Sequence, residues 1–277
     1  MLREIGMGLV LLSGLALSPG TVPAQSGVES ARAAPAAAAA AVPFGPGERL
    51  DYDVTLGRGF MTFHVGGGSF AVNGIDTVRG HPTYRLEMRL NGGALGVRVQ
   101  EDMTSWMDVV SLISRRFQQD QKEFHYERHR TLEFFPEEKA YFQPDKNEHG
   151  AIATDQPLDD ISFLYYARTL PLEPGQTYTL ARYFDAAGNP VRLVVLRRDT
   201  VKVPAGTFST IVVQPIIQTK GIFGQGGHAE VYFTDDERRM PVEVRSSVPF
   251  VGKLNMYLKS WTVGEPLTSG WNARAQR

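Results

Sequence analysis

The 277-residue sequence contains no cysteine. This absence excludes disulfide bridges, a thiol nucleophile, a cysteine-based zinc site and an acylated lipobox cysteine. The sequence also lacks an excess of either charge, because 29 Lys and Arg residues face 30 Asp and Glu residues and leave a formal net charge of -1. So balanced a chain gives no electrostatic argument for binding nucleic acid or an anionic membrane surface, and we expect no nucleic-acid partner.

Long apolar runs are missing except near the N-terminus, where a basic start precedes residues 5–17. This run is too short to span a bilayer comfortably, and Val22-Pro-Ala24 supplies a small-residue cleavage site. We therefore predict that residues 1–24 are a signal peptide and that Gln25 begins the mature chain. The protein would then be periplasmic or otherwise exported, with no integral membrane segment after cleavage. A membrane anchor that stays attached is the alternative.

The next segment, residues 25–42, is rich in alanine and has almost nothing to bury. Such a composition predicts a disordered tether. We expect one β-rich domain over residues 43–263 and a disordered polar tail over residues 264–277.

Helical periodicity is also scarce, and only one stretch of the mature chain predicts a helix, over residues 159–169. Asp159 or Asp160 can cap its first N–H groups. Apolar and amphipathic side chains follow at helical spacing and on the flanking positions: Ile161, Phe163, Leu164, Tyr165, Tyr166 and Arg168. Pro171 and then Pro174-Gly175 end the pattern.

Nearly all of the remaining chain alternates with the period of a strand, as in residues 50–56, where Leu50, Tyr52 and Val54 alternate with acidic residues. Asn73-Gly74 is a hairpin signal, and residues 143–157 predict a polar loop. Roughly a dozen strands at this spacing are typical of sandwiches and barrels. We predict an all-β fold: a large curved antiparallel sheet, a half-barrel or flattened barrel, with the short helix packed against its concave side. A two-sheet β-sandwich is the alternative.

Four stretches carry a resemblance to a known family: residues 43–52 (PFGPGERLDY), 160–172 (DISFLYYARTLPL), 200–208 (TVKVPAGTF) and 232–242 (YFTDDERRMPV). Their order and spacing resemble DUF3108, a family of bacterial exported proteins of unknown function. Phe233 stands where the family usually has a tryptophan, an apolar exchange. The resemblance covers about residues 43–263 and implies an envelope-exposed β protein.

Several polar pairs invite a catalytic or metal-binding interpretation that their surroundings disfavour. His125 and His129 have the spacing that chelates zinc on a helix, but on a strand such residues lie roughly 13 Å apart. The Asp159–Asp160 pair is explained by helix capping, and Asp235–Asp236 by an Asx-type turn. We predict no catalytic residue, no metal site and no cofactor.

Apolar residues in two predicted loops suggest contact with a ligand or partner, because loop tips are normally polar. These are Ile222-Phe223 and the stretch around Phe250. They either fold back over the core or form the lip of an apolar cavity beside the helix. Arg168 either pairs with a strand carboxylate or meets an anionic head group. The candidate ligand-binding residues are Tyr165, Tyr166, Arg168, Phe223 and Phe250.

For function, these patterns favour a non-enzymatic periplasmic or cell-envelope protein. It would bind an apolar or amphipathic ligand, such as a lipid, or an envelope protein partner in the concave face of the sheet. An envelope hydrolase acting on glycan or lipid is one alternative, and a structural assembly factor is another.

Overall fold

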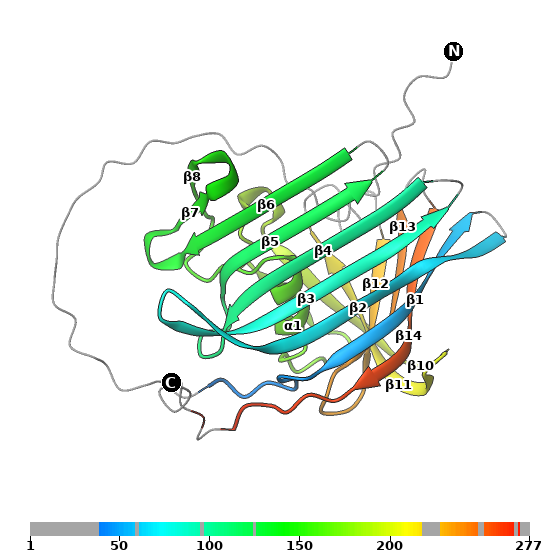
Figure 1. The fold of residues 1–277 in the computed structure, drawn as a ribbon. Coiled ribbons are helices and arrows are strands. Elements are labelled where there is room, and N and C mark those ends of the chain that lie inside the picture. Colours follow the sequence, from blue (N-terminus) through cyan, green and yellow to red (C-terminus); the bar gives the residue numbers. More distant parts are fainter. Residues whose placement is uncertain are drawn as a thin grey trace, which may run out of the picture.

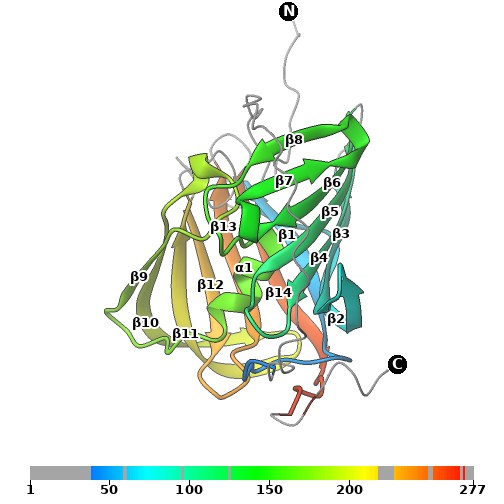
Figure 2. The same ribbon diagram turned by 90° about the vertical axis from the view of Figure 1, so that its left-hand side faces the viewer.

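The computed structural model describes residues 39–58, 61–94, 97–123, 126–217, 228–248, 252–268 and 271. Within these residues the chain forms one 14-stranded sheet and one α-helix. The strand order is β8-β7-β6-β5-β4-β3-β2-β1-β14-β13-β12-β11-β10-β9, and neighbouring strands pair antiparallel throughout. The sheet curves strongly without closing (Figures 1 and 2). This confirms the predicted curved sheet, and the two-sheet sandwich is not what the chain forms.

The strands fall into two series, one before and one after the helix. Before it come β1 (Arg49–Arg58), β2 (Met61–Val78), β3 (His81–Ala94), β4 (Val97–Asp108), β5 (Ser114–Glu123), β6 (Tyr126–Phe135), β7 (Ala140–Gln143) and β8 (Glu148–Ala151). After it come β9 (Thr177–Leu180), β10 (Val191–Val203), β11 (Gly206–Ile216), β12 (His228–Thr234), β13 (Pro241–Val248) and β14 (Gly252–Thr262). Short 3-10 turns lie at Pro136–Glu138, Pro144–Lys146 and Ala186–Gly188.

The first and last strands meet in the middle of the sheet, where β1 pairs with β14 from Arg49–Thr262 to Gly57–Lys253. The two edge strands, β8 and β9, are consecutive along the chain. The connection between them contains α1 (Asp160–Ala167). Figure 2 shows α1 in the trough between β9–β13 on one side and β1–β8 on the other. The helix therefore lies on the concave side of the sheet, as predicted.

The alternation seen in the sequence of β1 matches its burial. Leu50, Tyr52 and Val54 are buried, whereas Asp51 and Asp53 on the opposite side are only partly covered. One covered and one wetter face is the pattern expected of antiparallel strands.

The hairpin predicted at Asn73-Gly74 is wrong. β2 runs straight through these residues, and the pairing with β3 shifts between Val72 and Gly74, which makes a β-bulge. The reversal lies instead at Arg79-Gly80, with φ values of 48° and 82°. Two successive positive φ angles define the tight turn whose twist suits a two-residue hairpin.

The helix begins with a capping box. The Asp159 carboxylate accepts hydrogen bonds from the backbone N–H groups of Ile161 and Ser162, each at 3.0 Å. In return, the Ser162 hydroxyl accepts from the Asp159 N–H at 2.8 Å. Of the two predicted caps, Asp159 is the one used. The helix is one residue shorter at its start and two at its end than the predicted residues 159–169.

Residues on both sides of the predicted 43–263 domain also touch its core. Ala39, Ala40, Leu267 and Trp271 pack against the main hydrophobic cluster. The Ala40 N–H donates to the Val109 carbonyl at 2.8 Å. The described ends of the chain thus lie against the sheet.

Candidate functional site

Helix α1 has two apolar faces rather than one. Residues 161, 165 and 168 lie along one side, and residues 160, 163, 164 and 167 follow the i, i+3, i+4, i+7 spacing along the other. A helix that is apolar on two sides must be covered on both. The two halves of the curved sheet provide the two surfaces (Figure 2).

The first face packs tightly. Tyr165 is 1 % exposed, and its ring lies edge-on to Phe44 at a centroid distance of 4.9 Å. Phe44 in turn packs edge-on against Tyr84 of β3 at 5.4 Å. Burial raises the pKa of Tyr165. This side of the helix is a filled core.

Arg168 closes the C-terminal end of the helix. Its guanidinium donates to both Glu48 carboxylate oxygens, at 2.6 and 2.8 Å, and to the Arg238 carbonyl at 3.0 Å. It also lies over the rings of Phe44 and Tyr165, 5.2 Å from each centroid. Burial alone would lower the pKa of Arg168, but the hydrogen bonds and charge of Glu48 outweigh it and leave that pKa raised. The sequence left two alternatives for Arg168, a carboxylate partner or an anionic head group, and in the structure its partner is the carboxylate of Glu48.

The second face of the helix borders a pocket. About 500 Å³ of unfilled space, its open mouth included, lies between α1 and strands β10 to β12. The lining residues are Asp160, Phe163, Leu164, Ala167, Tyr183, Leu193, Val213, Pro215, Ile217, Val231 and Phe233. Apart from Asp160 and the Tyr183 hydroxyl, these side chains are apolar.

The polar groups of the pocket sit together at the N-terminal end of α1. The Tyr183 hydroxyl donates to Asp160 Oδ1 at 2.5 Å. Asp160 Oδ2 is enclosed by protein and has no hydrogen-bond partner. Burial, only partly offset by Tyr183 and Arg130, raises the pKa of Asp160 from 3.8 to about 7. The Asp160 carboxyl group at this end of the pocket therefore gains or loses its charge near neutral pH.

The candidate residues named from the sequence fall into three places. Tyr165 and Arg168 belong to the filled face of α1 and do not line the pocket. Tyr166 is half-buried and lies under the Arg182 guanidinium, 4.2 Å from the ring centroid. Phe223 and Phe250 lie outside the described residues. None of these five candidates is one of the helix residues that line the pocket, although the spacing of residues 160, 163, 164 and 167 could have revealed a second face.

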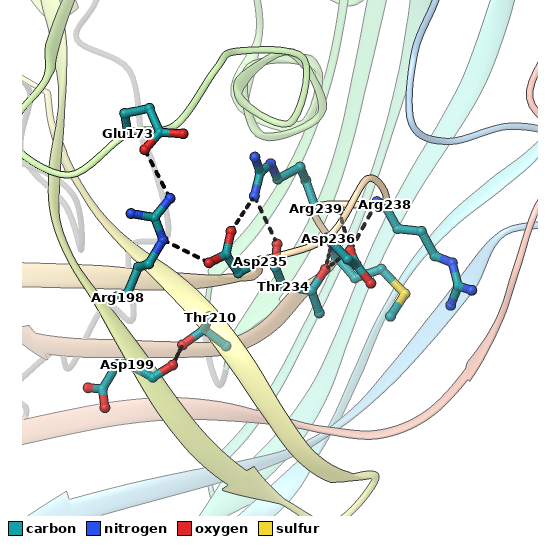
Figure 3. Close-up of polar contacts among 10 residues, drawn as sticks. Glu173, Arg198, Asp199, Thr210, Thr234, Asp235, Asp236, Arg238 and Arg239 are labelled. Atoms are coloured by element: carbon teal, nitrogen blue, oxygen red, sulfur yellow. Dashed lines mark hydrogen bonds and ion pairs between the residues drawn. The ribbon is translucent and has the colours of Figure 1, made fainter.

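The double aspartate after β12 is a turn (Figure 3). Asp236 Oδ1 accepts from the Thr234 hydroxyl at 2.6 Å and from the Arg238 N–H at 3.0 Å, as in an Asx-type turn. Asp235 accepts from Arg198 at 2.8 Å and from Arg239 at 3.2 Å. Desolvation acts to raise the pKa of Asp235, but these two hydrogen bonds outweigh it and leave that pKa lowered. Both carboxylate oxygens of Asp235 and Oδ1 of Asp236 thus accept hydrogen bonds from neighbouring protein groups.

The histidine pair is only partly described, because His125 lies outside the described residues. His129 on β6 contacts Asp120 on β5, and that hydrogen bond raises the pKa of the imidazole. Among the residues that the structure describes, no three His, Asp or Glu side chains gather in a way that could hold a metal ion.

Within the described ranges, no helix combines the length and the apolar character that crossing a bilayer requires.

Together, the open 14-stranded sheet, the helix in its concavity and the pocket between them define a β-barrel-like protein with an internal apolar site. The chain belongs to the DUF3108 family, described as proteins of unknown function, whose model matches residues 51–259.

A comparison with solved structures finds similar chains at low sequence identity, and the first of the two described here shares the fold. A β-barrel-like protein of the DUF1849 family from Brucella abortus matches with a TM-score of 0.51 and 12% identity, over 81% of this chain and 100% of that one. A candidate lipoprotein from Parabacteroides distasonis matches with a TM-score of 0.36 and 9% identity, over 80% of this chain and 99% of that one. A search of curated proteins finds no match.

Proposed function

We propose that this protein is a non-enzymatic component of the bacterial envelope that binds an apolar or amphipathic ligand in the concave face of its sheet. The observation that carries the proposal is the apolar pocket between α1 and strands β10 to β12. The protein keeps this space open beside a helix whose other face is fully packed. An apolar cavity with a few polar groups at one end is the usual form of a small-molecule site.

The shape of the pocket suits a ligand with an apolar chain. The pocket face of α1 runs from Asp160 to Ala167, roughly 10 Å at the rise of an α-helix. Phe163 and Leu164 lie between these ends and offer apolar surface throughout. A chain lying along the helix would bury the surface that faces the pocket wall, and each buried methylene contributes about 0.8 kcal/mol.

Export is part of the proposal. A signal peptide over residues 1–24 would deliver the domain to the periplasm, and residues 25–42 would separate it from the cleavage site. The resemblance of the sequence to DUF3108 implies an exported protein, and this implication supports the placement.

The hydrolase alternative would need two carboxyl groups facing one another across the pocket. Among the described residues that line it, Asp160 is the one carboxylic acid. The neighbouring Asp159 is buried and bonded to Ser105 and to the helix N-terminus. The arrangement therefore favours binding over acid–base chemistry. An envelope partner in the concave face, or a purely structural assembly role, are the other candidates.

The proposal is tested by uptake of N-phenyl-1-naphthylamine, an uncharged dye that fluoresces in apolar surroundings, and of a fluorescent fatty acid. Val213→Phe and Val231→Phe each add a ring at the pocket wall and should reduce uptake by about tenfold or more. Thr207→Phe, which adds the same ring at an exposed position of β11, is the matched control. Circular dichroism and thermal melting check that each variant is folded.

Charged substitutions at Phe223 and Phe250 should also weaken uptake if these residues form the lip of the cavity. Mass spectrometry of an organic extract from natively purified protein gives an independent readout of a resident lipid. If the wild type binds neither probe and the extract is empty, the binding role is refuted and the structural role takes its place.

A further inference from the structure

We propose that the Asp160 end of the pocket is a head-group subsite that selects an amphiphile with an uncharged, hydrogen-bonding head, such as a hydroxyl or a primary amide, over one with an anionic head. The inference rests on the proposed function, since it names the ligand class of the same pocket. It is carried by the position of Asp160 on an otherwise apolar wall and by the unsatisfied hydrogen-bonding capacity of its carboxyl group.

The carboxyl group of Asp160 is held at one oxygen and free at the other. Oδ1 accepts the Tyr183 hydroxyl at 2.5 Å, and Oδ2 has no partner. A buried polar atom without a partner is unfavourable, so a ligand group that hydrogen-bonds to it gains affinity. Because Oδ2 is enclosed by protein, a ligand group reaches it after a rotation about the terminal torsion of Asp160, which is soft.

The groups around Asp160 restrict the charge that can approach. Tyr183 faces it from the segment after β9, Arg130 and Arg128 from β6, and Asp159 from the adjoining helix cap. Arg130 is 6 % exposed, and its Nε has no hydrogen-bond partner. The positive charges of Arg130 and Arg128 act on this end of the pocket from behind its wall and disfavour a cationic head, whereas the charges of Asp160 and Asp159 disfavour an anionic head.

A hydroxyl or primary amide avoids both conflicts because it can donate and accept. It donates to Asp160 when the carboxyl group is ionised and accepts from it when the group is protonated. An alkyl carboxylate can only accept, so it bonds to the protonated form and is repelled by the ionised form. Since the pKa of Asp160 is raised to about 7, both forms occur near neutral pH. The selection against an anionic head should therefore strengthen as the pH rises.

The experiment measures competition for bound N-phenyl-1-naphthylamine by three amphiphiles with the same twelve-carbon chain: dodecanol, dodecanoate and dodecylamine. At about pH 8.5, dodecanol should displace the dye from the wild type at a concentration about tenfold lower than dodecanoate. At about pH 5.5 the ratio should shrink several-fold, because Asp160 is then protonated.

Asp160→Asn is the decisive variant, since it keeps the size of the side chain and removes its charge. In this variant, the ratio of the dodecanoate and dodecanol concentrations that displace the dye should change with pH only through protonation of dodecanoate itself, so the wild-type ratio should change several-fold more. Comparing each ratio with its wild-type counterpart cancels the different water solubility of the two competitors. Tyr183→Phe, which removes the donor to Oδ1, serves as a second variant should Asp160→Asn not fold.

The outcomes separate the two proposals. If the wild type takes up the dye but shows the same ratio as Asp160→Asn at both pH values, the head-group inference is overturned and the binding role stands. A preference for dodecylamine over dodecanol by tenfold or so would also overturn it, in favour of a cation site. If the wild type takes up no dye, the proposed function itself fails.

Discussion

Arg168 and Glu48 form a bidentate ion pair inside the protein, with N–O distances of 2.6 and 2.8 Å, although 120 residues separate them in the sequence. The same guanidinium donates to the Arg238 carbonyl. It therefore joins three of the four stretches that carry the family resemblance: the segment before β1, the helix, and the turn after β12. This contact fixes the end of α1, and with it the position of the pocket face of the helix.

Glu48→Gln should strongly destabilise the fold. It leaves a buried guanidinium without its counter-charge, and breaking such a pair by removing one partner typically costs about 3–5 kcal/mol. Arg49→Gln is the matched control, because the neighbouring Arg49–Asp51 pair is exposed, and it should cost about 1 kcal/mol or less. Urea denaturation measures both. Equal losses would mean that the buried pair does not hold the helix end.

The two faces of α1 should respond differently to truncation. Ile161 is 2 % exposed on the filled face, so Ile161→Ala should cost about 2–5 kcal/mol. Leu164 is half-buried beside open space, so Leu164→Ala removes fewer contacts and should cost about 1–2 kcal/mol. Chemical denaturation of both variants is the test. A larger loss of stability for Leu164→Ala than for Ile161→Ala would mean that the tightly packed face is the one that carries Leu164, which contradicts the structure.

Stability should depend on pH through Asp160. The raised pKa of about 7 means that the folded state holds this proton more tightly than the unfolded state does. The free energy of unfolding should therefore fall as the pH rises from about 4 to about 7, by up to a few kcal/mol. Asp160→Asn should flatten this slope, and the part that persists belongs to other groups such as Asp159, whose pKa burial also raises. Parallel slopes for wild type and variant would refute the assignment.

The N-terminus of the mature protein should be at or near Gln25. The signal-peptide pattern predicts recovery from the periplasmic fraction or another compartment outside the cytoplasm. Cell fractionation followed by N-terminal sequencing decides it. Full-length protein in the cytosol, with Met1 intact, would contradict the prediction.

The sequence predicted the fold well because its periodicities are strong. The alternation of Leu50, Tyr52 and Val54 reports a covered strand face directly, and the helix between Asp159 and the prolines was clear from its cap and spacing. Strand β8 was not predicted within the polar stretch of residues 143–157, because Glu148–Ala151 is a short edge strand with few apolar residues. Asn73-Gly74 misled because a bulge and a hairpin both favour glycine at positive φ.

The site was harder to predict than the fold. The sequence places apolar and aromatic residues on more than one side of the helix, but it does not say which side meets a filled core and which meets a pocket. That depends on Leu193, Val213 and Val231, which lie far along the chain on strands β10 to β12. Only the pairing of strands brings them opposite Phe163. The presence of aromatic residues on more than one side of the helix was the one local signal.

The seam between β1 and β14 has a consequence for how the protein forms. Each half of the sheet is built from hairpins between consecutive strands, which can form locally and rapidly. The seam instead pairs Arg49 with Thr262, and closing a loop of that length is entropically costly. The two halves must therefore find each other after most of the chain is available. The trough is therefore complete only once the last strand, β14, is available to pair with β1.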